Sequence, residues 1–278
     1  MRTLLARTAA VAAGAYLCVL AFLYLTQQSQ VFPSKAADNA LDAAVRERFP
    51  DMRALSLPTP DGSVLSGWLL ARPDAAQDAP APLVLYFGGN ADLCSQFLLD
   101  APRELPGFSI AAFDYRGYGR STGVPSETAL KADALLLYDR LTAAGGARKT
   151  IVMGRSLGTA LAAHVAANRE AAAVILVTPF DSIRAVGQQR HPFIPVGLLL
   201  KNPFDVLPDA AQIYAPALVL IAARDTTVPP EHARRLAEAL RGQEKTVVLD
   251  GDHASILKKT EYWPSIRDFL RENGAGPR

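Results

Sequence analysis

A serine flanked by glycines is the residue of this sequence whose type and spacing most directly suggest covalent chemistry. It is Ser156, in the run Gly-Arg-Ser-Leu-Gly at 154–158, between a short apolar segment at 150–153 and an alanine- and leucine-rich segment. On a tight strand-to-helix turn, the residues two before and two after the serine must be small, and the hydroxyl is exposed over the sheet edge. The run also occurs by chance. We expect Ser156 to be a nucleophile if a base, an acid and an oxyanion site accompany it.

The base should be a histidine, because its imidazole titrates near neutral pH and can take the serine proton. Of the four histidines, His253 alone follows the last apolar segment, in a Gly/Asp loop. His164 lies along the helical segment after the serine, His191 in an insertion, and His232 early in a charged helical segment. Each of these three is more simply a surface or packing residue, so His253 is the predicted base.

Two aspartates could orient that histidine. Asp225 follows the apolar segment 217–222, and Asp181 follows the segment 173–177 before it. We favour Asp225, because the turn Arg-Asp-Thr-Thr-Val-Pro presents it just ahead of a helix and within reach of the final loop. Asp250 and Asp252 are interpreted as shaping the histidine loop. For the oxyanion, the N–H of Leu157 is available, and the turn at 88–90 can supply a second donor.

The elements that must position these residues read as an alternation of strands and helices. Two alternating segments around a Pro/Gly turn, 52–57 and 63–70, predict a hairpin. Six short apolar runs predict buried strands, with helical stretches between them such as 127–144, 157–168 and 230–241. The runs are 83–87, 109–113, 150–153, 173–177, 217–222 and 246–249. The predicted fold class is α/β, an eight-stranded mostly parallel sheet with helices on both faces and the chemistry at its strand ends.

The N-terminal segment is apolar and long. No charged residue occurs in 8–30, the run 9–25 is apolar throughout, and Arg2 and Arg7 precede it. At about 1.5 Å per residue this length spans a bilayer core. A cleavable signal peptide is the alternative, but its possible cleavage site, Ser34-Lys35-Ala36, lies far downstream, so we favour an uncleaved anchor. The positive-inside rule then places the N-terminus in the cytoplasm and the rest outside, facing the periplasm if the source is bacterial.

These patterns predict the domain organisation. A cytoplasmic N-terminus, 1–7, precedes a transmembrane anchor, 8–28, and a connector, 29–50, that contains a helix at 36–48. The main α/β domain, 51–272, carries a short cap insertion, 182–214. A flexible tail, 273–278, follows it. The apolar residues of the insertion could roof a pocket for an acyl chain or simply pack on the sheet.

Composition excludes several other classes. A net charge of +2, with basic residues scattered, does not favour nucleic-acid binding. Cys18 and Cys94 lie in segments expected to be far apart and have no ligand-like neighbours, so neither a disulfide framework nor a zinc site is predicted. We expect no metal and no organic cofactor.

Several motifs together resemble the α/β-hydrolase superfamily, and more narrowly its membrane-anchored branch of protein depalmitoylases and uncharacterised bacterial hydrolases. They are the runs FGGNA (87–91), DYRGYGRSTG (114–123), GRSLG (154–158), ALVLI (217–221) and DTTVP (225–229), with His253 and the post-anchor run QVFP (30–33). The resemblance covers roughly residues 28–270. It implies a triad of Ser156, Asp225 and His253 and an oxyanion hole from the N–H groups of Asn90 and Leu157. It also implies a structural role for 114–121. This chain has Gly-Gly-Asn at 88–90 where the branch has His-Gly-Asn.

The predicted function is a membrane-anchored serine hydrolase that cleaves a carboxylic ester or thioester, of a small molecule or an acylated substrate, through an acyl-serine intermediate. A serine peptidase of aminopeptidase type is one alternative, because the same triad cuts amides. A non-catalytic, membrane-tethered binding protein is another, but all three triad positions hold competent residues. A dehalogenase is excluded because it needs a carboxylate where Ser156 stands.

Overall fold

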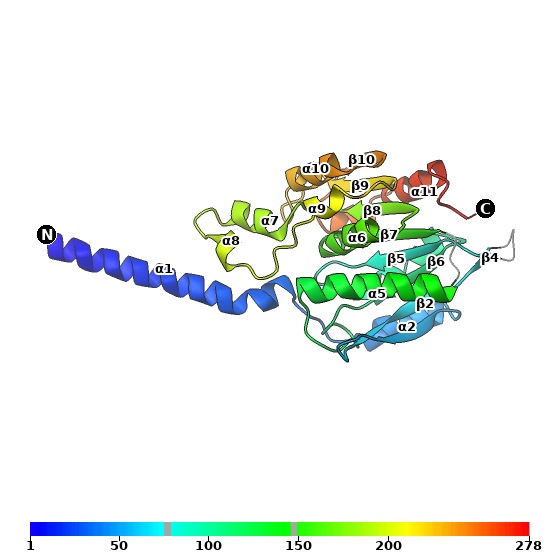
Figure 1. The fold of residues 1–278 in the computed structure, drawn as a ribbon, viewed down its shortest axis with the longest axis horizontal. Coiled ribbons are helices and arrows are strands. Elements are labelled where there is room, and N and C mark those ends of the chain that lie inside the picture. Colours follow the sequence, from blue (N-terminus) through cyan, green and yellow to red (C-terminus); the bar gives the residue numbers. More distant parts are fainter. Residues whose placement is uncertain (75–78, 146–148, 278) are drawn as a thin grey trace.

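An eight-stranded sheet forms the centre of the computed structural model, which describes residues 1–74, 79–145 and 149–277. Its strand order is β1-β2-β6-β5-β7-β8-β9-β10 (Figure 1). The hairpin β1–β2 and the pair β2–β6 are antiparallel, and all other pairs are parallel. The predicted eight-stranded, mostly parallel sheet is confirmed. The strands are β1 (Arg53–Pro58), β2 (Val64–Leu70), β5 (Leu83–Phe87), β6 (Ser109–Phe113), β7 (Thr150–Arg155), β8 (Ala173–Val177), β9 (Ala217–Ala222) and β10 (Glu244–Leu249).

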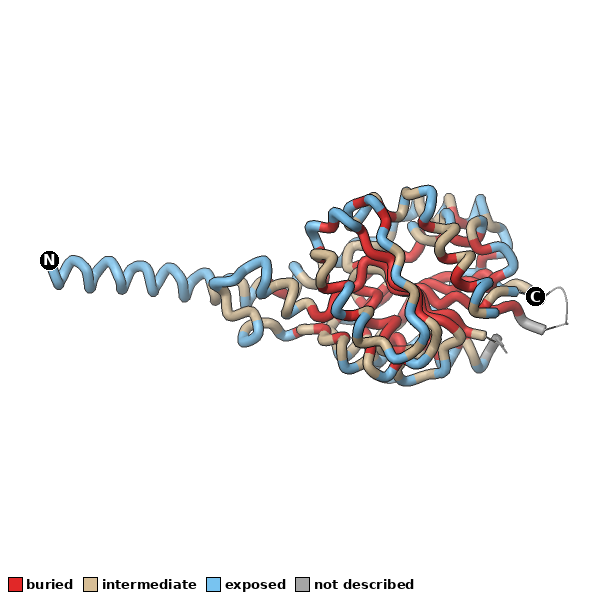
Figure 2. The backbone as a smooth tube through the Cα atoms, turned by 90° about the horizontal axis from the view of Figure 1, so that it is seen from above, coloured by how far each residue is buried: buried red, intermediate tan, exposed pale blue. Residues whose placement is uncertain are grey.

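Helices cover both faces of this sheet, as predicted. Alternate residues of a strand point to opposite faces, so Leu83, Leu85 and Phe87 of β5 join one buried cluster while Val84 and Tyr86 join the other. The first cluster includes residues of α5 (Glu127–Gly145), α6 (Leu157–Asn168), α9 (Leu207–Ala210) and α10 (Pro230–Ala239). The second includes α2 (Asn39–Arg48), α3 (Cys94–Leu98), α4 (Ala101–Glu104), the 3₁₀ helix η1 (Ser255–Lys258) and α11 (Tyr262–Glu272). Figure 2 shows the buried strands between partly exposed helices.

The structure differs from the sequence expectation at some element ends. The connecting helix begins at Asn39 rather than 36, because the Asp38 side chain accepts hydrogen bonds from the N–H groups of Ala40 and Leu41 and caps it. β10 starts two residues early, at charged Glu244, which an exposed edge strand tolerates. Two short strands, β3 (Pro73–Asp74) and β4 (Ala79–Pro80), pair within the predicted loop 71–82, of which 75–78 lie outside the described residues.

The predicted flexible tail, 273–278, is packed over its first part. Gly274 has φ +61°, and the N–H groups of Gly274 and Ala275 donate to the carbonyl oxygens of Arg271 and Leu270. This is the Schellman arrangement that ends a helix at a left-handed glycine. It folds Ala275 back into the core, where it is 1% exposed, so a free tail is wrong for this stretch. Residue 278 lies outside the described part of the chain.

A long helix and a small cap project from the C-terminal edge of the parallel strands. α1 (Arg2–Val31) is long and apolar enough to cross a membrane, by length and composition, and it extends away from the domain (Figures 1 and 2). The predicted anchor, 8–28, lies within it. α7 (Ile183–Arg190) and α8 (Val196–Leu199) lie beside its second half. We call residues 183–200 the cap; the later part of the predicted insertion packs in the core through Phe204, Val206 and Ala210.

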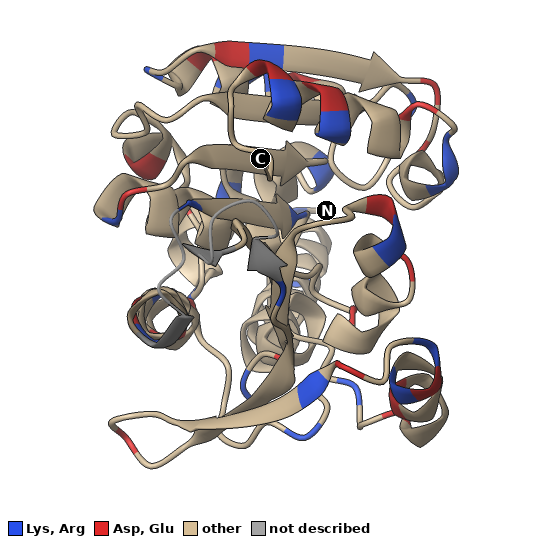
Figure 3. Cartoon of the chain, turned by 90° about the vertical axis from the view of Figure 1, so that its right-hand side faces the viewer, with Lys and Arg blue, Asp and Glu red and all other residues tan. Residues whose placement is uncertain are grey.

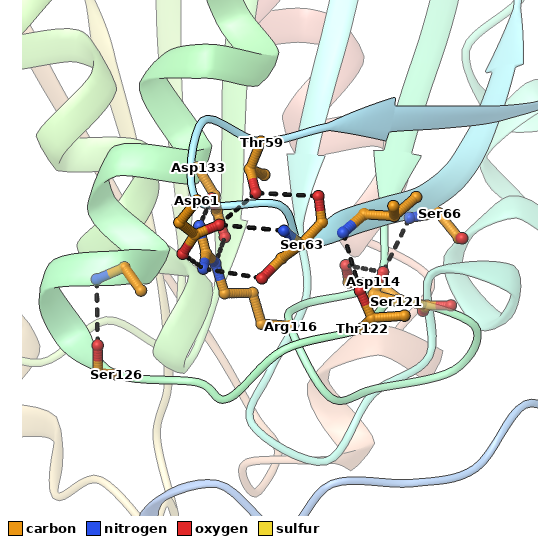
Figure 4. Close-up of polar contacts among 12 residues, drawn as sticks. Thr59, Asp61, Ser63, Ser66, Asp114, Arg116, Ser121, Thr122, Ser126 and Asp133 are labelled. Atoms are coloured by element: carbon orange, nitrogen blue, oxygen red, sulfur yellow. Dashed lines mark hydrogen bonds and ion pairs between the residues drawn. The ribbon is translucent and has the colours of Figure 1, made fainter.

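A buried ion-pair network holds the loop after β6 (Figure 4). Arg116, 6% exposed, donates to both carboxylate oxygens of Asp133 on α5 and also contacts Asp61 in the β1–β2 turn. The Arg116 hydrogen bond lowers the pKa of Asp61 below its ordinary value. Ser121 Oγ accepts from the Ser66 N–H. These contacts fix the loop that follows β6. Elsewhere, the two charge signs are mixed along the outer helices and edge strand β10 (Figure 3).

Candidate active site

Ser156 occupies the turn between β7 and α6 in a backbone conformation that non-glycine residues rarely adopt, with φ +48°. The glycines two residues away on each side are required by space. A Cβ on Gly158 would lie 2.1 Å from the carbonyl oxygen of Phe87, and one on Gly154 would lie 2.3 Å from that of Gly158. Close contact of β5, β7 and α6 therefore forces the turn, and Ser156 on this turn lines a cavity.

His253 and Asp225 complete a line of hydrogen-bond contacts from Ser156. His253 Nε2 lies 2.9 Å from Ser156 Oγ, and His253 Nδ1 lies 2.7 Å from Asp225 Oδ2. The other oxygen, Asp225 Oδ1, accepts the N–H groups of Thr227 at 2.9 Å and Val228 at 2.8 Å. Asp225 is 6% exposed. The structure thus brings together the three residues that the sequence singled out, on the loops after β7, β9 and β10.

The loop that carries His253 is shaped by the aspartates beside it. Asp252 Oδ1 accepts the N–H groups of Ala254 and Ser255 at the start of η1. These bonds, that of Ser255 first, lower the pKa of Asp252. Asp250 pairs with Arg224 at the surface. The partners of these two aspartates lie in the loop or at the surface, whereas the His253 imidazole contacts Asp225 and Ser156, which agrees with their interpretation as loop-shaping residues.

Asp181, the other candidate acid, belongs to a different cluster. Its carboxylate contacts His232 Nδ1 at 2.7 Å and Arg235 Nε at 2.6 Å, and it is 4% exposed. Burial raises its pKa, but the hydrogen bonds from Arg235 and His232 outweigh burial and lower the pKa overall. His232 is a buried residue that also contacts Gln189 of the cap. The sequence left both aspartates open, and Asp225 is the one in contact with His253.

The two residues expected to supply the oxyanion-hole N–H groups lie at the same cavity as Ser156. Asn90 and Leu157 both line the cavity with Ser156. Among the described residues, neither N–H donates a hydrogen bond to the protein. The Tyr118 hydroxyl holds the Asn90 carbonyl oxygen at 2.8 Å, and that of Tyr115 holds the Gly88 carbonyl oxygen at 2.6 Å. Free donors on a turn fixed in this way are suited to bind a developing oxyanion.

An ion pair missed by the sequence reasoning ties two of these loops together. Arg155 Nη1 donates to Asp92 Oδ2 at 2.6 Å, and the same oxygen accepts the Gly89 N–H at 2.8 Å. Arg155 Nη2 also lies 3.4 Å from the carbonyl oxygen of His253. Burial lowers the pKa of Arg155, but the charge of Asp92, its hydrogen bond to Arg155 and the neighbouring tyrosines together raise the pKa overall. The sequence did offer a signal for this ion pair, namely an arginine beside the nucleophile and an aspartate just after the glycine turn.

The cavity beside Ser156 has a volume of about 360 Å³ and is walled mainly by apolar side chains. This volume is within the range of small-molecule sites. The cap roofs it, which was one of the two roles left open for the insertion. The sequence reasoning did not foresee that α1 forms one wall. Its lining comprises Leu23, Gln27, Gln30 and Val31 of α1; Ile183, Val186, Gly187, Arg190, His191, Ile194, Val196, Leu199 and Leu200 of the cap; and Asn90, Ser156, Leu157, Phe180, Thr227, Val228 and His253 of the strand-end loops.

The remaining candidates for ligands are dispersed. Cys18 is exposed on α1 and Cys94 is buried at the start of α3. Within residues 1–74, 79–145 and 149–277, no three His, Cys, Asp or Glu side chains are grouped so that they could hold a metal ion. His164 contacts Asp209 Oδ2 at 3.1 Å on the far part of α6. These residues take no part in the contacts around Ser156.

The chain is similar in sequence to one protein family model and to several known proteins. Residues 79–202 match a family model described as serine aminopeptidase, S33. An uncharacterised protein of Mycobacterium tuberculosis is 31% identical over 91% of this chain and 90% of its own length. An uncharacterised membrane protein of Saccharomyces cerevisiae is 33% identical over 92% of each chain. The lysophosphatidylserine lipase of Danio rerio is 29% identical, covering 68% of this chain and 58% of that protein.

Solved structures share the fold. An esterase of Pyrococcus furiosus superposes with a TM-score of 0.65 at 20% identity, covering 87% of this chain and 96% of that one. A cold-adapted esterase from an Arctic intertidal metagenomic library gives a TM-score of 0.62 at 21% identity, covering 80% and 93%. At this level of identity the likeness shows a common architecture of sheet and helices.

Proposed function

The chain belongs to the α/β-hydrolase superfamily, as an esterase- or lipase-type hydrolase, and from this premise we propose that it is a membrane-anchored serine hydrolase. It cleaves a carboxylic ester or thioester through an acyl-serine intermediate. The observation that carries the proposal is the continuous contact from Ser156 Oγ through His253 to Asp225, at 2.9 and 2.7 Å, beside a mainly apolar cavity that Ser156 and His253 line.

In the proposed mechanism, His253 Nε2 takes the hydroxyl proton as Ser156 Oγ attacks the substrate carbonyl carbon. Asp225 keeps the proton of neutral His253 on Nδ1 and stabilises the imidazolium that forms. The N–H groups of Asn90 and Leu157 bind the oxyanion. His253 then protonates the leaving alcohol or thiol, which departs and leaves the acyl group on Ser156. A water molecule, deprotonated by the same imidazole, hydrolyses this acyl-enzyme.

A peptidase is the second candidate, because the matching family model is described as a serine aminopeptidase. An aminopeptidase must recognise a positively charged amino terminus, and a carboxylate is the usual partner for such a group. Among the described residues that line the cavity there is no Asp or Glu, and Arg190 is present. This lining favours an acyl substrate over a free amino terminus.

Membrane attachment through α1 is the second part of the proposal. The span 8–28 crosses the bilayer once, with Arg2 and Arg7 on the cytoplasmic side and the hydrolase domain on the other. Retention of the helix is supported by Phe32, which follows α1 directly and is 3% exposed in the core. Cleavage after Ala36 would remove Phe32 and the α1 wall of the cavity. An uncleaved anchor therefore agrees better with the packing than a signal peptide.

The test is covalent labelling of the full-length protein in detergent with a fluorophosphonate probe. We expect labelling of the wild type and of Ser34→Ala, an exposed serine, and none of Ser156→Ala. Rates on p-nitrophenyl butyrate and on an aminoacyl anilide then separate esterase from peptidase. Absence of labelling in folded wild-type protein, or labelling of Ser156→Ala at the wild-type rate, would contradict the assignment of the nucleophile.

A further inference from the structure

The far end of the cap is unusually apolar for a surface segment. Residues 192–200, which we call the cap tip, have the sequence Pro-Phe-Ile-Pro-Val-Gly-Leu-Leu-Leu, without a charged side chain. Phe193 and Leu198 are each 87% exposed. We propose that the cap tip is immersed in the same bilayer leaflet as the second half of α1, and that the acyl chain of the substrate enters the cavity directly from that leaflet. This inference rests on the membrane-anchored hydrolase proposed above.

The cap tip is continuous with the apolar part of α1. The Tyr16 hydroxyl donates to the carbonyl oxygen of Phe193 at 2.7 Å, and Gln27 Nε2 donates to that of Leu199 at 2.9 Å. Tyr16 and Gln27 are eleven residues apart, so the contacts extend over about 16 Å of helix. One leaflet of a bilayer core is about 15 Å thick. If the apolar run 9–25 is in the membrane, the cap tip lies alongside it at the same depth.

Polar residues return at one level in both segments. α1 becomes polar at residues 26–30, where Thr, Gln and Ser replace the apolar run. The cap tip is followed directly by Lys201. Lys201 Nζ lies 4.2 Å from the ring centroid of Tyr24. A lysine and a tyrosine in contact are typical of the boundary between hydrocarbon and headgroups. We therefore expect α1 and the cap tip to leave the hydrocarbon core of the bilayer at the same level.

Side chains of the protein satisfy several backbone hydrogen-bonding groups of the cap tip. A peptide group in hydrocarbon must find its hydrogen bond inside the protein. Gln188 Nε2 donates to the carbonyl oxygens of His191 and Pro192, each at 3.3 Å, and its Oε1 accepts the Val196 N–H at 3.2 Å. Gln27 Oε1 accepts the Lys201 N–H at 2.7 Å. On a surface facing water these groups would need no such side-chain partners.

The cavity has apolar walls on the side where α1 and α8 meet. Leu23 and Val31 of α1 and Val196 and Leu199 of α8 line the same cavity as Ser156. An acyl chain that passes from the leaflet between these helices would stay in contact with apolar side chains until its carbonyl carbon reached Ser156. It would avoid the cost of exposing its methylene groups to water.

Fluorescence quenching tests the depth of the cap tip. The full-length protein is reconstituted in phosphatidylcholine vesicles that carry bromine on their acyl chains, as Phe193→Trp, Leu198→Trp or the control Tyr214→Trp. Tyr214 is 73% exposed and precedes β9, so it lies at the amino-terminal ends of the parallel strands, whereas the cap lies at their carboxyl ends. We expect the tryptophans at 193 and 198 to be quenched well beyond the background from Trp68 and Trp263, and that at 214 not to be. Equal quenching at all three positions would overturn the immersion.

Hydrolysis tests the entry route. For the double variant Phe193→Ser/Leu198→Ser we expect an unchanged rate on water-soluble p-nitrophenyl acetate, because neither side chain lines the cavity. The rate on a long-chain ester embedded in vesicles should fall by about fivefold or more. Equal vesicle rates for variant and wild type would overturn entry from the leaflet. A wild type that cleaves neither ester would instead contradict the proposed function, while the quenching result would still decide the position of the cap tip.

Discussion

Replacing Asp225 by asparagine should nearly abolish turnover without unfolding the protein, because the surroundings of this side chain fix the orientation of the new amide. The backbone N–H groups of Thr227 and Val228 both point at the Oδ1 position. The amide oxygen will take that position, which turns the NH₂ group toward His253 Nδ1. The imidazole must then carry its proton on Nε2, facing Ser156 as a donor. In this tautomer His253 cannot act as a base.

The size of the effect follows from the cost of the opposite orientation. Turning the amide would leave the N–H groups of Thr227 and Val228 against an NH₂ group, at about 1–3 kcal/mol for each N–H that loses its acceptor away from water, as the buried N–H of Val228 does. A penalty of only about 2 kcal/mol already reduces the productive tautomer roughly 30-fold. Loss of the negative charge that stabilises the imidazolium adds to this reduction. We therefore expect kcat to fall by about 10⁴, the size of effect that this substitution has in a Ser-His-Asp triad.

The assay is kcat on p-nitrophenyl butyrate for full-length protein in detergent, with thermal unfolding of each variant recorded in parallel. Asp181→Asn is the matched control, with the same chemical change at a buried aspartate that contacts His232 and Arg235 instead. It should lower stability, by about 3 kcal/mol, and change kcat by only a few-fold in folded protein. A folded Asp225→Asn variant that keeps more than about a tenth of wild-type kcat would refute the tautomer argument. If Asp181→Asn alone were inactive, the orienting acid would be Asp181.

Two further predictions concern stability. Gly158→Ala should destabilise the protein by about 3 kcal/mol or prevent folding, because its Cβ would lie 2.1 Å from the Phe87 carbonyl oxygen. The control Gly276→Ala, at a half-buried glycine whose added Cβ would have nothing within 4 Å, should be neutral. Equal melting temperatures for the Gly158→Ala and Gly276→Ala variants would contradict the packing argument. The lowered pKa of Asp181 means that its ionised form stabilises the fold above its ordinary pKa of 3.8, and that this stability is lost as the pH falls through the lower, folded-state pKa. The difference in melting temperature between wild type and Asp181→Asn should thus be largest near pH 7 and shrink below pH 4; a constant difference would argue against this linkage.

The arrangement of the sheet and the meeting of the candidate residues could be predicted because they depend on local patterns. Apolar runs identify parallel strands, and the carboxyl ends of such strands meet at one edge, so residues that follow different runs become neighbours. This logic selected Ser156 and His253 and favoured Asp225 over Asp181. Their catalytic roles stay predictions until the variants are measured.

Contacts between distant segments with no shared pattern could not be predicted. Arg155 and Asp92 are 63 residues apart, and neither is part of an apolar period or a recognisable ligand set. The α1 wall of the cavity was missed for a similar reason. An apolar helix of this length is explained by the membrane alone, and only the packing of Gln27 and Phe32 shows that its end belongs to the domain.

The rigid junction between α1 and the domain determines how far the enzyme can reach. A flexible tether of n residues would let the domain roam about 5–6 Å × √n from its anchor. Here the chain has no such slack, because Gln27 is bonded to the cap and Phe32 is buried directly after the helix. With α1 in a bilayer, Ser156 would stay at one height and one tilt above that bilayer. The rate at which the enzyme meets substrate would then depend on the number of substrate molecules per unit area of its own membrane. Ser156 could not reach substrate in a facing membrane.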